Sequence, residues 1–256
     1  SLSPLVFVVA LIPLTIILRQ TGFGYQTLKN AAKISHLLYM DDLKLYGKSA
    51  AELESLLNTV RIFSNNISME FGLDKCATLT IQRGSVVNTE GINLPNNNIR
   101  GLNLEESYKY LGILQADDIK HVQVKKKATT EYTKRLRKVL KSKLNGGNCI
   151  RAINSWAVPV IRYTAGVVDW TQAELEDLDR KTRKLMTANH ALHAQSDVDW
   201  LYLPRKAGGR GLLQVRQTVE EEKRALNDYI SSSTENALKE VANKELLKVQ
   251  DTKTEY

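Results

Sequence analysis

The stretch HLLYMDDLKLYG, residues His36–Gly47, places Asp41 and Asp42 side by side between two short apolar runs. Runs of this length and composition are typical of β-strands, and a tight turn at Met40-Asp41 would join them. We therefore expect a hairpin with two adjacent carboxylates. Because like charges repel, the pair needs an explanation.

The local sequence leaves two interpretations of this pair open. Leu43 and Leu45 alternate with Lys44 and Tyr46 after the turn, so the carboxylates are expected at the rim of a sheet. Aspartate is a common turn residue, and the turn alone could account for it. Alternatively, divalent cations would neutralise both carboxylates; Mg²⁺ prefers hard oxygen ligands, and two such ions stabilise a phosphoryl displacement.

A second pair, Asp117-Asp118, provides a comparison within the same sequence. It also follows an apolar strand, but it leads directly into a long basic stretch with helical spacing. Aspartate at the start of a helix satisfies free N–H groups and complements the helix dipole. We therefore interpret the second pair as a helix cap.

Composition limits the class of protein. The 256 residues are 43% apolar, which supports a substantial core, and the net charge of +8 favours a polyanionic partner. The two cysteines, Cys76 and Cys149, lie far apart without metal-ligand spacing. A disulfide framework or zinc finger is therefore not expected, and a reducing, intracellular compartment fits better.

The chain opens at Ser1 with an almost wholly apolar run, Leu5–Leu18, which follows Pro4 and contains Pro13. This run is shorter than the roughly twenty residues that a membrane-spanning helix needs. We expect a buried helix and no membrane contact, with a membrane anchor as the competing interpretation. A start directly in apolar sequence also suggests a chain cut inside a domain.

The first part of the chain has the pattern of a mixed α+β layer. The apolar helix and the hairpin precede a second helix, for which Ser49 and Glu52 predict a capping box. Further strands are expected in CATLTIQ, Cys76–Gln82, and in YKYLGIL, Tyr108–Leu114, with a loop or edge hairpin between them.

From Asp117 onward the pattern is helical, and we place domain limits at 1–117, 118–190 and 191–256. The expected helices run from about Asp118 to Leu144, Asn148 to Val168, Thr171 to Ala188, Val215 to Ser231 and Asn236 to Val249. Pro159 predicts a kink, and Thr171 with Glu174 predicts another capping box. The segment LYLPRKAGGRGL predicts a turn-rich insert.

The segment Lys120–Lys143 concentrates the positive charge. It holds ten Lys or Arg and one acid, Glu131, and thus carries +9 in a chain of +8. An apolar stripe for docking is supplied by Tyr132, Leu136, Val139, Leu140 and Leu144. We expect contact with duplex phosphates through Lys125, Lys126, Lys127, Lys134, Arg135, Lys138 and Lys141. The alternative is a solvated face whose lysine stems shield apolar surface.

Other candidate residues carry weaker signals. Lys75 could act as a general acid, but it could equally end an ordinary turn. Around Gly208-Gly209, a phosphate cradle would use Arg205, Lys206 and Arg210, although a simple turn explains them as well. The four histidines show no base-and-nucleophile pattern. For Trp156 and Trp170 we favour the core over the alternative of base-stacking platforms.

The motif Tyr39-Met40-Asp41-Asp42 resembles the metal-binding hairpin of reverse transcriptases, and neighbouring stretches resemble the non-LTR retrotransposon type in the same order. These stretches are the loop-and-helix segment Ser1–Leu14, GLDKC at Gly72–Cys76, YKYLGI at Tyr108–Ile113, and the downstream INSWAVPVIRYTAGVVDWT and LYLPRKAGGRGL. Their order and spacing extend over most of the chain.

This resemblance implies an RNA-directed DNA polymerase with a partial palm, a helical thumb and a helical extension. It implies that Asp41 and Asp42 bind Mg²⁺, that Lys75 is the lysine of its motif, and that a primer grip is formed by Tyr110, Leu111 and Gly112. RNA template, DNA primer and dNTP would be the partners.

The sequence departs from the family pattern at its start. The family's third metal-binding aspartate lies on a palm strand upstream of the SLSP motif, where this sequence has no residues. We therefore expect a fragment that is inactive alone and that needs a missing N-terminal half. The alternative is a noncatalytic duplex-binding module with a degenerate metal hairpin.

Overall fold

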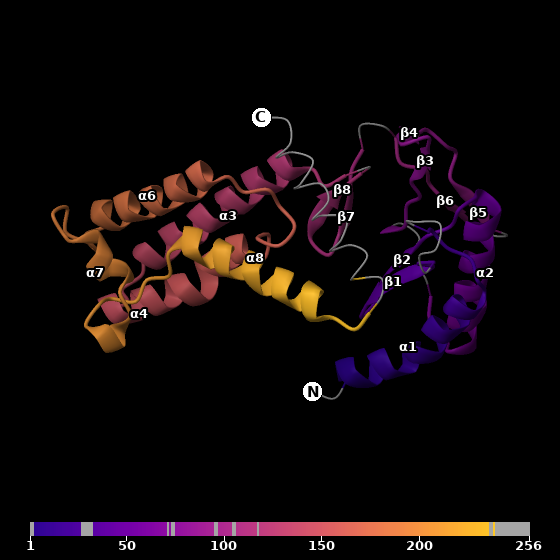
Figure 1. Ribbon diagram of the computed structural model, residues 1–256, viewed down its shortest axis with the longest axis horizontal. Helices are drawn as coiled ribbons and strands as arrows, with labels where there is room; N and C mark the ends of the chain where they lie inside the picture. Colours follow the sequence, from indigo (N-terminus) through magenta and orange to yellow (C-terminus); the bar gives the residue numbers. More distant parts are fainter. Residues whose placement is uncertain are drawn as a thin grey trace. The chain divides into compact units, whose positions relative to one another are not determined.

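The computed structural model describes residues 3–26, 33–70, 72, 75–94, 97–103, 106–116, 118–235 and 238. These residues form two compact units that divide after Asp118 (Figure 1). Hairpins and two helices build the first unit, and the second is helical, so the mixed α+β class is confirmed. Asp117 and most of the helix expected at Asn236–Val249 lie outside the described residues. The helix after Asp118 begins at His121 with Lys120 at its N-cap and no side-chain capping bond, so the helix-cap interpretation of Asp118 was wrong.

The first unit is organised around two helices and one hairpin. These elements are α1 (Ser3–Gln20), α2 (Ala50–Asn66), β1 (His36–Tyr39) and β2 (Asp42–Leu45). Leu11, Leu14 and Leu18 of α1 meet Leu56 and Val60 of α2 in a buried cluster. The apolar side of the hairpin packs on that cluster through Leu38, Leu43 and Leu45.

Helix α1 is buried on one face only, which corrects the expectation of a buried helix. The three buried leucines recur at helical spacing, as expected for a single docking face. The opposite side exposes Leu5, Val6, Val9, Ile12 and Ile16. None of the helices in the described part of the chain is long and apolar enough to cross a membrane.

The remaining strands of the first unit form antiparallel two-stranded hairpins. They are β3 (Thr80–Gln82) with β4 (Ser85–Val87), β5 (Ile92–Leu94) with β6 (Asn97–Ile99), and β7 (Tyr108–Tyr110) with β8 (Ile113–Gln115). The single strand expected over Tyr108–Leu114 was therefore wrong. Its chain reverses at Leu111 and Gly112, which have φ angles of 46° and 79°.

The capping box expected at α2 is only half formed. Ser49 Oγ accepts a hydrogen bond from the Glu52 N–H at 3.3 Å. The Glu52 carboxylate instead accepts from the backbone N–H of Lys48 at 2.9 Å and of Gly24 at 3.5 Å. Glu52 thus ties the loop after α1 to the start of α2.

The second unit is a bundle whose long helices are α3 (His121–Leu140), α6 (Gln172–Ala188) and α8 (Val215–Ser232). Shorter elements are α4 (Gly146–Ala152), α5 (Val158–Arg162), α7 (Val198–Tyr202) and the 3₁₀ turn η3 (Arg205–Ala207). Helix α3 packs against α4, α5 and α6, and α8 packs against α5 and α6 (Figure 1). The capping box of Thr171 and Glu174 at α6 is confirmed.

A π-helical turn, η2 (Ile153–Ala157), separates α4 from α5. A kink was predicted at Pro159, and the structure has this π-helical turn directly before α5, in whose first turn Pro159 lies. Proline has no N–H to continue the α-helical hydrogen bonding. Asn154 fixes the turn from the side. Its amide donates to Gly211 O at 2.8 Å, and its side-chain oxygen accepts from Leu213 N–H at 3.0 Å.

The N-terminus of α8 is capped from another helix. Gln214 makes no side-chain capping bond there. Instead, the buried carboxylate of Asp179 on α6 accepts from the N–H groups of Val215 at 2.8 Å and Arg216 at 3.1 Å. One side chain therefore satisfies two N–H groups that the helix itself leaves free.

Candidate metal-binding and nucleic-acid-binding sites

The hairpin of β1 and β2 forms as the sequence predicts. Tyr39 pairs with Asp42, so the turn consists of Met40 and Asp41 alone. Met40 has a φ of 53°, a conformation that non-glycine residues adopt rarely and that clusters at functional sites. This tight turn holds the two carboxylates at fixed neighbouring positions.

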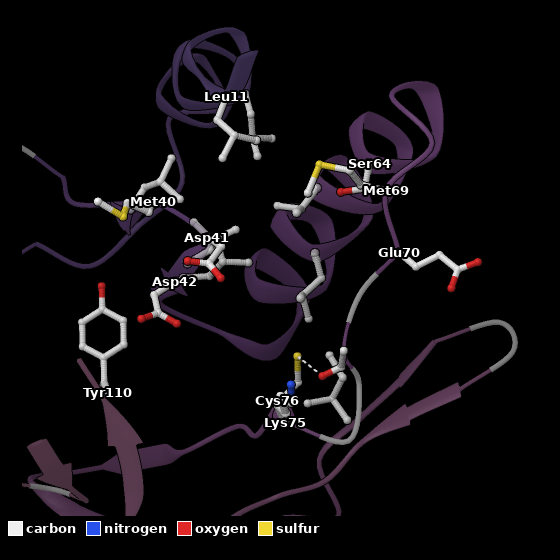
Figure 2. Close-up of a pocket in the computed structure, with 18 of the residues that line it drawn as sticks. Leu11, Met40, Asp41, Asp42, Ser64, Met69, Glu70, Lys75, Cys76 and Tyr110 are labelled. Atoms are coloured by element: carbon white, nitrogen blue, oxygen red, sulfur yellow. Dashed lines mark hydrogen bonds between the residues drawn. The ribbon is translucent and has the colours of Figure 1, made fainter. Parts of the chain in front are cut away.

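Both carboxylates are exposed and open onto one cavity of about 720 Å³ in the first unit. Figure 2 shows Asp41 and Asp42 beside the turn, and Tyr110 and Lys75 from two other segments line the same cavity. Apolar side chains from α1 and α2, among them Leu11, Leu14 and Val60, line another part of the cavity, and Glu70 and Cys76 also line it. Among the described residues, neither carboxylate has a hydrogen-bond or ion-pair partner.

These two carboxylates fit part of a magnesium shell. Their oxygens are the hard ligands that Mg²⁺ prefers, and the cavity leaves room for waters or phosphate oxygens. Within the described ranges, however, no three His, Cys, Asp or Glu side chains form a group that could hold a metal ion. The described residues thus supply two ligands and not a full cage.

The structure places Lys75 on the cavity that Asp41 and Asp42 share. Its side chain is exposed, and its backbone N–H donates to Gly72 O at 2.9 Å in a tight turn. The adjacent Cys76 thiol also donates to Gly72 O, at 3.5 Å. Leu73 and Asp74 of the same motif lie outside the described residues.

The primer-grip candidates lie on the β7–β8 hairpin. Tyr110 lines the cavity, whereas Leu111 and Gly112 form the turn. Burial, with smaller contributions from Tyr46 and Asp42, raises the pKa of the Tyr110 hydroxyl. Tyr110 is therefore half-buried near the carboxylates and stays protonated at neutral pH.

Sequence reasoning missed one residue at this site, Lys44. It lies on the polar face of β2, and its ammonium donates to Gln115 Oε1 at 2.9 Å. The same ammonium lies 5.6 Å from the ring centre of Tyr46 and 5.4 Å from that of Tyr110. The alternation of leucine and polar residues in β2 was the available signal, because it places Asp42 and Lys44 on one face.

The basic helix α3 separates its cations into exposed and packed groups. The exposed group, which we call the lysine ridge, consists of Lys126, Lys127, Lys134, Arg137, Lys138 and Lys141. Lys134, Lys138 and Lys141 follow at spacings of four and three residues, so they form a continuous stripe. Arg137 belongs to this exposed group although it was not among the sequence candidates.

The other two candidates on α3 make internal contacts. Lys125 pairs with Glu174 at 2.7 Å, and only 17% of its side chain is exposed. Arg135 donates to Glu131 Oε1 at 2.8 Å and to the backbone oxygen of Trp156 at 3.0 Å. These two cations hold the bundle together and do not extend freely from it.

Three expectations about apolar residues are settled by exposure. Tyr132, Leu136, Val139 and Leu140 are buried as predicted, but Leu144 is 46% exposed because α3 ends at Leu140. Trp170 is only 7% exposed and is therefore buried, as expected. Trp156 is 42% exposed, so its assignment to the core was wrong.

The arginines of the LYLPRKAGGRGL insert stabilise a turn. Arg210 donates to Ala191 O at 2.8 Å and lies 5.4 Å from the ring centre of Trp200. Gly208 has a φ of 86°, and a Cβ at Gly209 would lie 2.1 Å from Leu203 O. This backbone geometry requires glycine and favours the simple-turn interpretation over a phosphate cradle.

In the described part of the chain, one hairpin thus carries two carboxylates without partners, and one helix carries the lysine ridge. No family model matches the chain. The chain is 24% identical over 222 residues, 85% of its length, to the "Retrovirus-related Pol polyprotein from type-1 retrotransposable element R2" of Popillia japonica. It is therefore distantly related to a retrotransposon Pol polyprotein, and the match spans 36% of that protein's length.

Proposed function

We propose that this chain is the C-terminal part of the RNA-directed DNA polymerase domain of a non-LTR retroelement, with a partial palm in the first unit and a thumb in the second. One observation carries the proposal. Asp41, Asp42, Lys75 and Tyr110, all selected for their resemblance to polymerase motifs, line one cavity although they are spread over seventy residues. The distant relationship to a retrotransposon Pol polyprotein supports it.

Each residue then has a role that follows from its position. Asp41 and Asp42 would hold Mg²⁺, which neutralises the charge that develops during phosphoryl displacement. Lys75 would supply a cation, and potentially a proton, at the edge of the same cavity. The turn at Leu111-Gly112 would offer backbone groups to the primer end, with Tyr110 packed beneath it.

The lysine ridge would contact the sugar-phosphate backbone of a template–primer duplex. Its six cations lie on one exposed side of α3. The one acid of that helix, Glu131, pairs with Arg135 at 2.8 Å and, more loosely, with the ridge residue Lys134 at 3.9 Å. Phosphate contacts of this kind carry no sequence information. We therefore expect binding with little sequence preference.

Salt-dependent binding tests the ridge. Affinity for a B-DNA duplex should fall with salt by about 0.9 log units per log unit of salt for each phosphate contacted. Reversing the charges of Lys127, Lys134, Lys138 and Lys141 should flatten that dependence. Lys184→Glu on α6 is the control for charge reversal outside the ridge. An unchanged slope in the ridge variant would place the binding surface elsewhere.

Complementation tests the polymerase assignment. Two carboxylates leave most of an octahedral shell to other ligands, so we expect the chain alone to extend no primer. Adding the upstream part of a related Pol polyprotein in trans should produce Mg²⁺-dependent, template-directed synthesis. Asp41→Asn should abolish this synthesis and spare duplex binding, whereas the exposed Asp177→Asn should affect neither.

A second candidate function is a noncatalytic duplex-binding module. The observation in its favour is that the described residues bring no third ligand to Asp41 and Asp42. Duplex binding through the ridge, combined with no synthesis in the complementation experiment, would favour this module over the polymerase.

A further inference from the structure

Trp156 is the large aromatic side chain of η2, and 42% of its surface is exposed. The guanidinium carbon of Arg135 lies 5.4 Å from the centre of its indole ring. A cation over one ring face is an attractive cation–π arrangement. It leaves the rest of the indole available to solvent or to a ligand.

The backbone and the arginine on which the indole rests are each anchored by hydrogen bonds. Arg135 is anchored by its bonds to Glu131 and to the backbone oxygen of Trp156 itself. The backbone of η2 is anchored by the two hydrogen bonds of Asn154 to the 211–213 segment. Because the backbone beneath the indole is anchored and Arg135 already lies over one ring face, a ligand that contacts the ring has less motion to restrict. π-Helical turns within α-helices are often found at functional sites.

Trp156 also borders the lysine ridge. Arg135 contacts the indole, and Lys138 lies one turn further along the same helix, so its side chain is a neighbour of Arg135. Proteins that bind single strands combine a basic track for the phosphates with aromatic rings on which bases stack. In a duplex the bases are already stacked on one another and offer no free face along its length.

We infer that the exposed face of Trp156 is a stacking platform for an unpaired base of the bound nucleic acid, such as the single-stranded template beyond the duplex. This inference rests on the proposed function and specifies its ligand more narrowly. The lysine ridge would hold the phosphates, and Trp156 would distinguish a strand with free bases from a fully paired one.

The chain contains a matched control in Trp200. It is 45% exposed and has Arg210 at the same 5.4 Å from its ring centre, but it lies on α7 and its indole N–H donates to Gly208 O. Trp170 is the only other tryptophan in the sequence and is buried. Tryptophan fluorescence can therefore be assigned by single Trp→Phe substitutions.

The test compares an oligothymidylate of about 16 nucleotides, the upper site size of single-strand-binding folds, with a blunt duplex of the same length. In the full chain carrying Trp200→Phe, the oligothymidylate should quench Trp156 emission, and the duplex should quench it far less. Trp156→Ala should weaken oligothymidylate binding about 5- to 150-fold, which corresponds to about 1–3 kcal/mol for one stacked base, and leave duplex binding within about twofold. Trp156→Phe should restore most of the loss, and Trp200→Ala should cause none.

The outcomes separate this inference from the proposed function. If ridge charge reversal weakens duplex binding but Trp156→Ala leaves oligothymidylate binding unchanged, only the platform is refuted. Equal losses for both ligands in Trp156→Ala, without rescue by phenylalanine, would show a purely structural role and also refute it. If Trp156→Ala does not fold, the quenching measurement decides, because quenching by the duplex equal to that by the oligothymidylate contradicts the platform.

Discussion

The ammonium of Lys44 donates a hydrogen bond of 2.9 Å to Gln115 Oε1 and thereby joins two hairpins that lie 71 residues apart in sequence. The rings of Tyr46 and Tyr110 lie beside the same ammonium. Since Lys44 shares a face of β2 with Asp42, this contact fixes the carboxylate hairpin relative to the β7–β8 hairpin. It is a positioning contact within the first unit.

The pH dependence of stability should report this contact. Burial lowers the pKa of Lys44 from its usual 10.5. Between the lowered pKa and 10.5 the unfolded chain binds more protons than the folded chain, so the free energy of unfolding rises with pH in that window. Below the window Lys44 is charged in both states, and the full cost of burying its charge lowers the free energy of unfolding. Burial raises the pKa values of Tyr46 and Tyr110 above 10.0, so these two hydroxyls lose their protons at a higher pH than in the unfolded chain.

Urea denaturation at a series of pH values checks this prediction. The difference in unfolding free energy between the wild type and Lys44→Met should move in favour of the wild type as pH rises toward 10.5. A difference that stays constant with pH would mean that Lys44 is solvated to the same extent in the folded and unfolded chains.

Neighbouring lysines on α3 should respond differently to the same substitution. Lys127→Gln removes an exposed ridge cation and should reduce the salt slope of duplex binding by about 0.9, with stability within about 0.5 kcal/mol of wild type. Lys125→Gln breaks the pair with Glu174 and should lower the unfolding midpoint while leaving the salt slope unchanged. Titrations at several salt concentrations and thermal melts measure both quantities. A salt slope that falls in Lys125→Gln but not in Lys127→Gln would contradict the prediction.

The Asp179 cap predicts a large effect from one buried carboxylate. Asp179→Ala leaves the N–H groups of Val215 and Arg216 without their acceptor and should cost about 2 kcal/mol. Asp179→Asn keeps one acceptor oxygen and should cost about half as much. Urea denaturation measures both, and the exposed Asp177→Ala should change stability by less than about 0.5 kcal/mol.

Metal binding at the hairpin should be weak and specific. Asp41 and Asp42 offer only two carboxylates, so most of the shell remains water. Manganese relaxation measurements should detect binding in the wild-type chain that disappears in the double variant Asp41→Asn, Asp42→Asn. Tight binding that survives this substitution would place the metal site at other residues.

Features with local causes were predictable from the sequence. The hairpin at Asp41 and the Thr171 capping box depend on residues within a few positions of each other, and both are confirmed. The capping box of Ser49 and Glu52 was predicted only in part, because the N–H of Gly24, 28 residues away, competes for the Glu52 carboxylate. A local sequence pattern does not indicate a hydrogen-bond partner that only the folded chain brings close.

The β7–β8 hairpin and the exposure of Trp156 were missed for related reasons. In the β7–β8 turn, Leu111 has a φ of 46° although it is not glycine. The polar residues that usually indicate a turn are absent from this position, so the sequence did not predict it. Trp156 was expected in the core because large aromatic residues are mostly buried. Its exposure follows from the π-helical turn, whose supporting bonds come from Gly211 and Leu213. Tertiary contacts decided both cases.

The π-helical turn gives the second unit an unusual sensitivity to chain length. A turn with i→i+5 bonds contains one residue more than an α-helical turn, so η2 is equivalent to a single inserted residue. Removing one residue between Ile153 and Ala157 would let α4 run into α5 as a regular helix and would rotate the following side chains by about 100°. The indole of Trp156 would then leave Arg135, and Asn154 would lose the 211–213 segment, although the composition of the chain would hardly have changed.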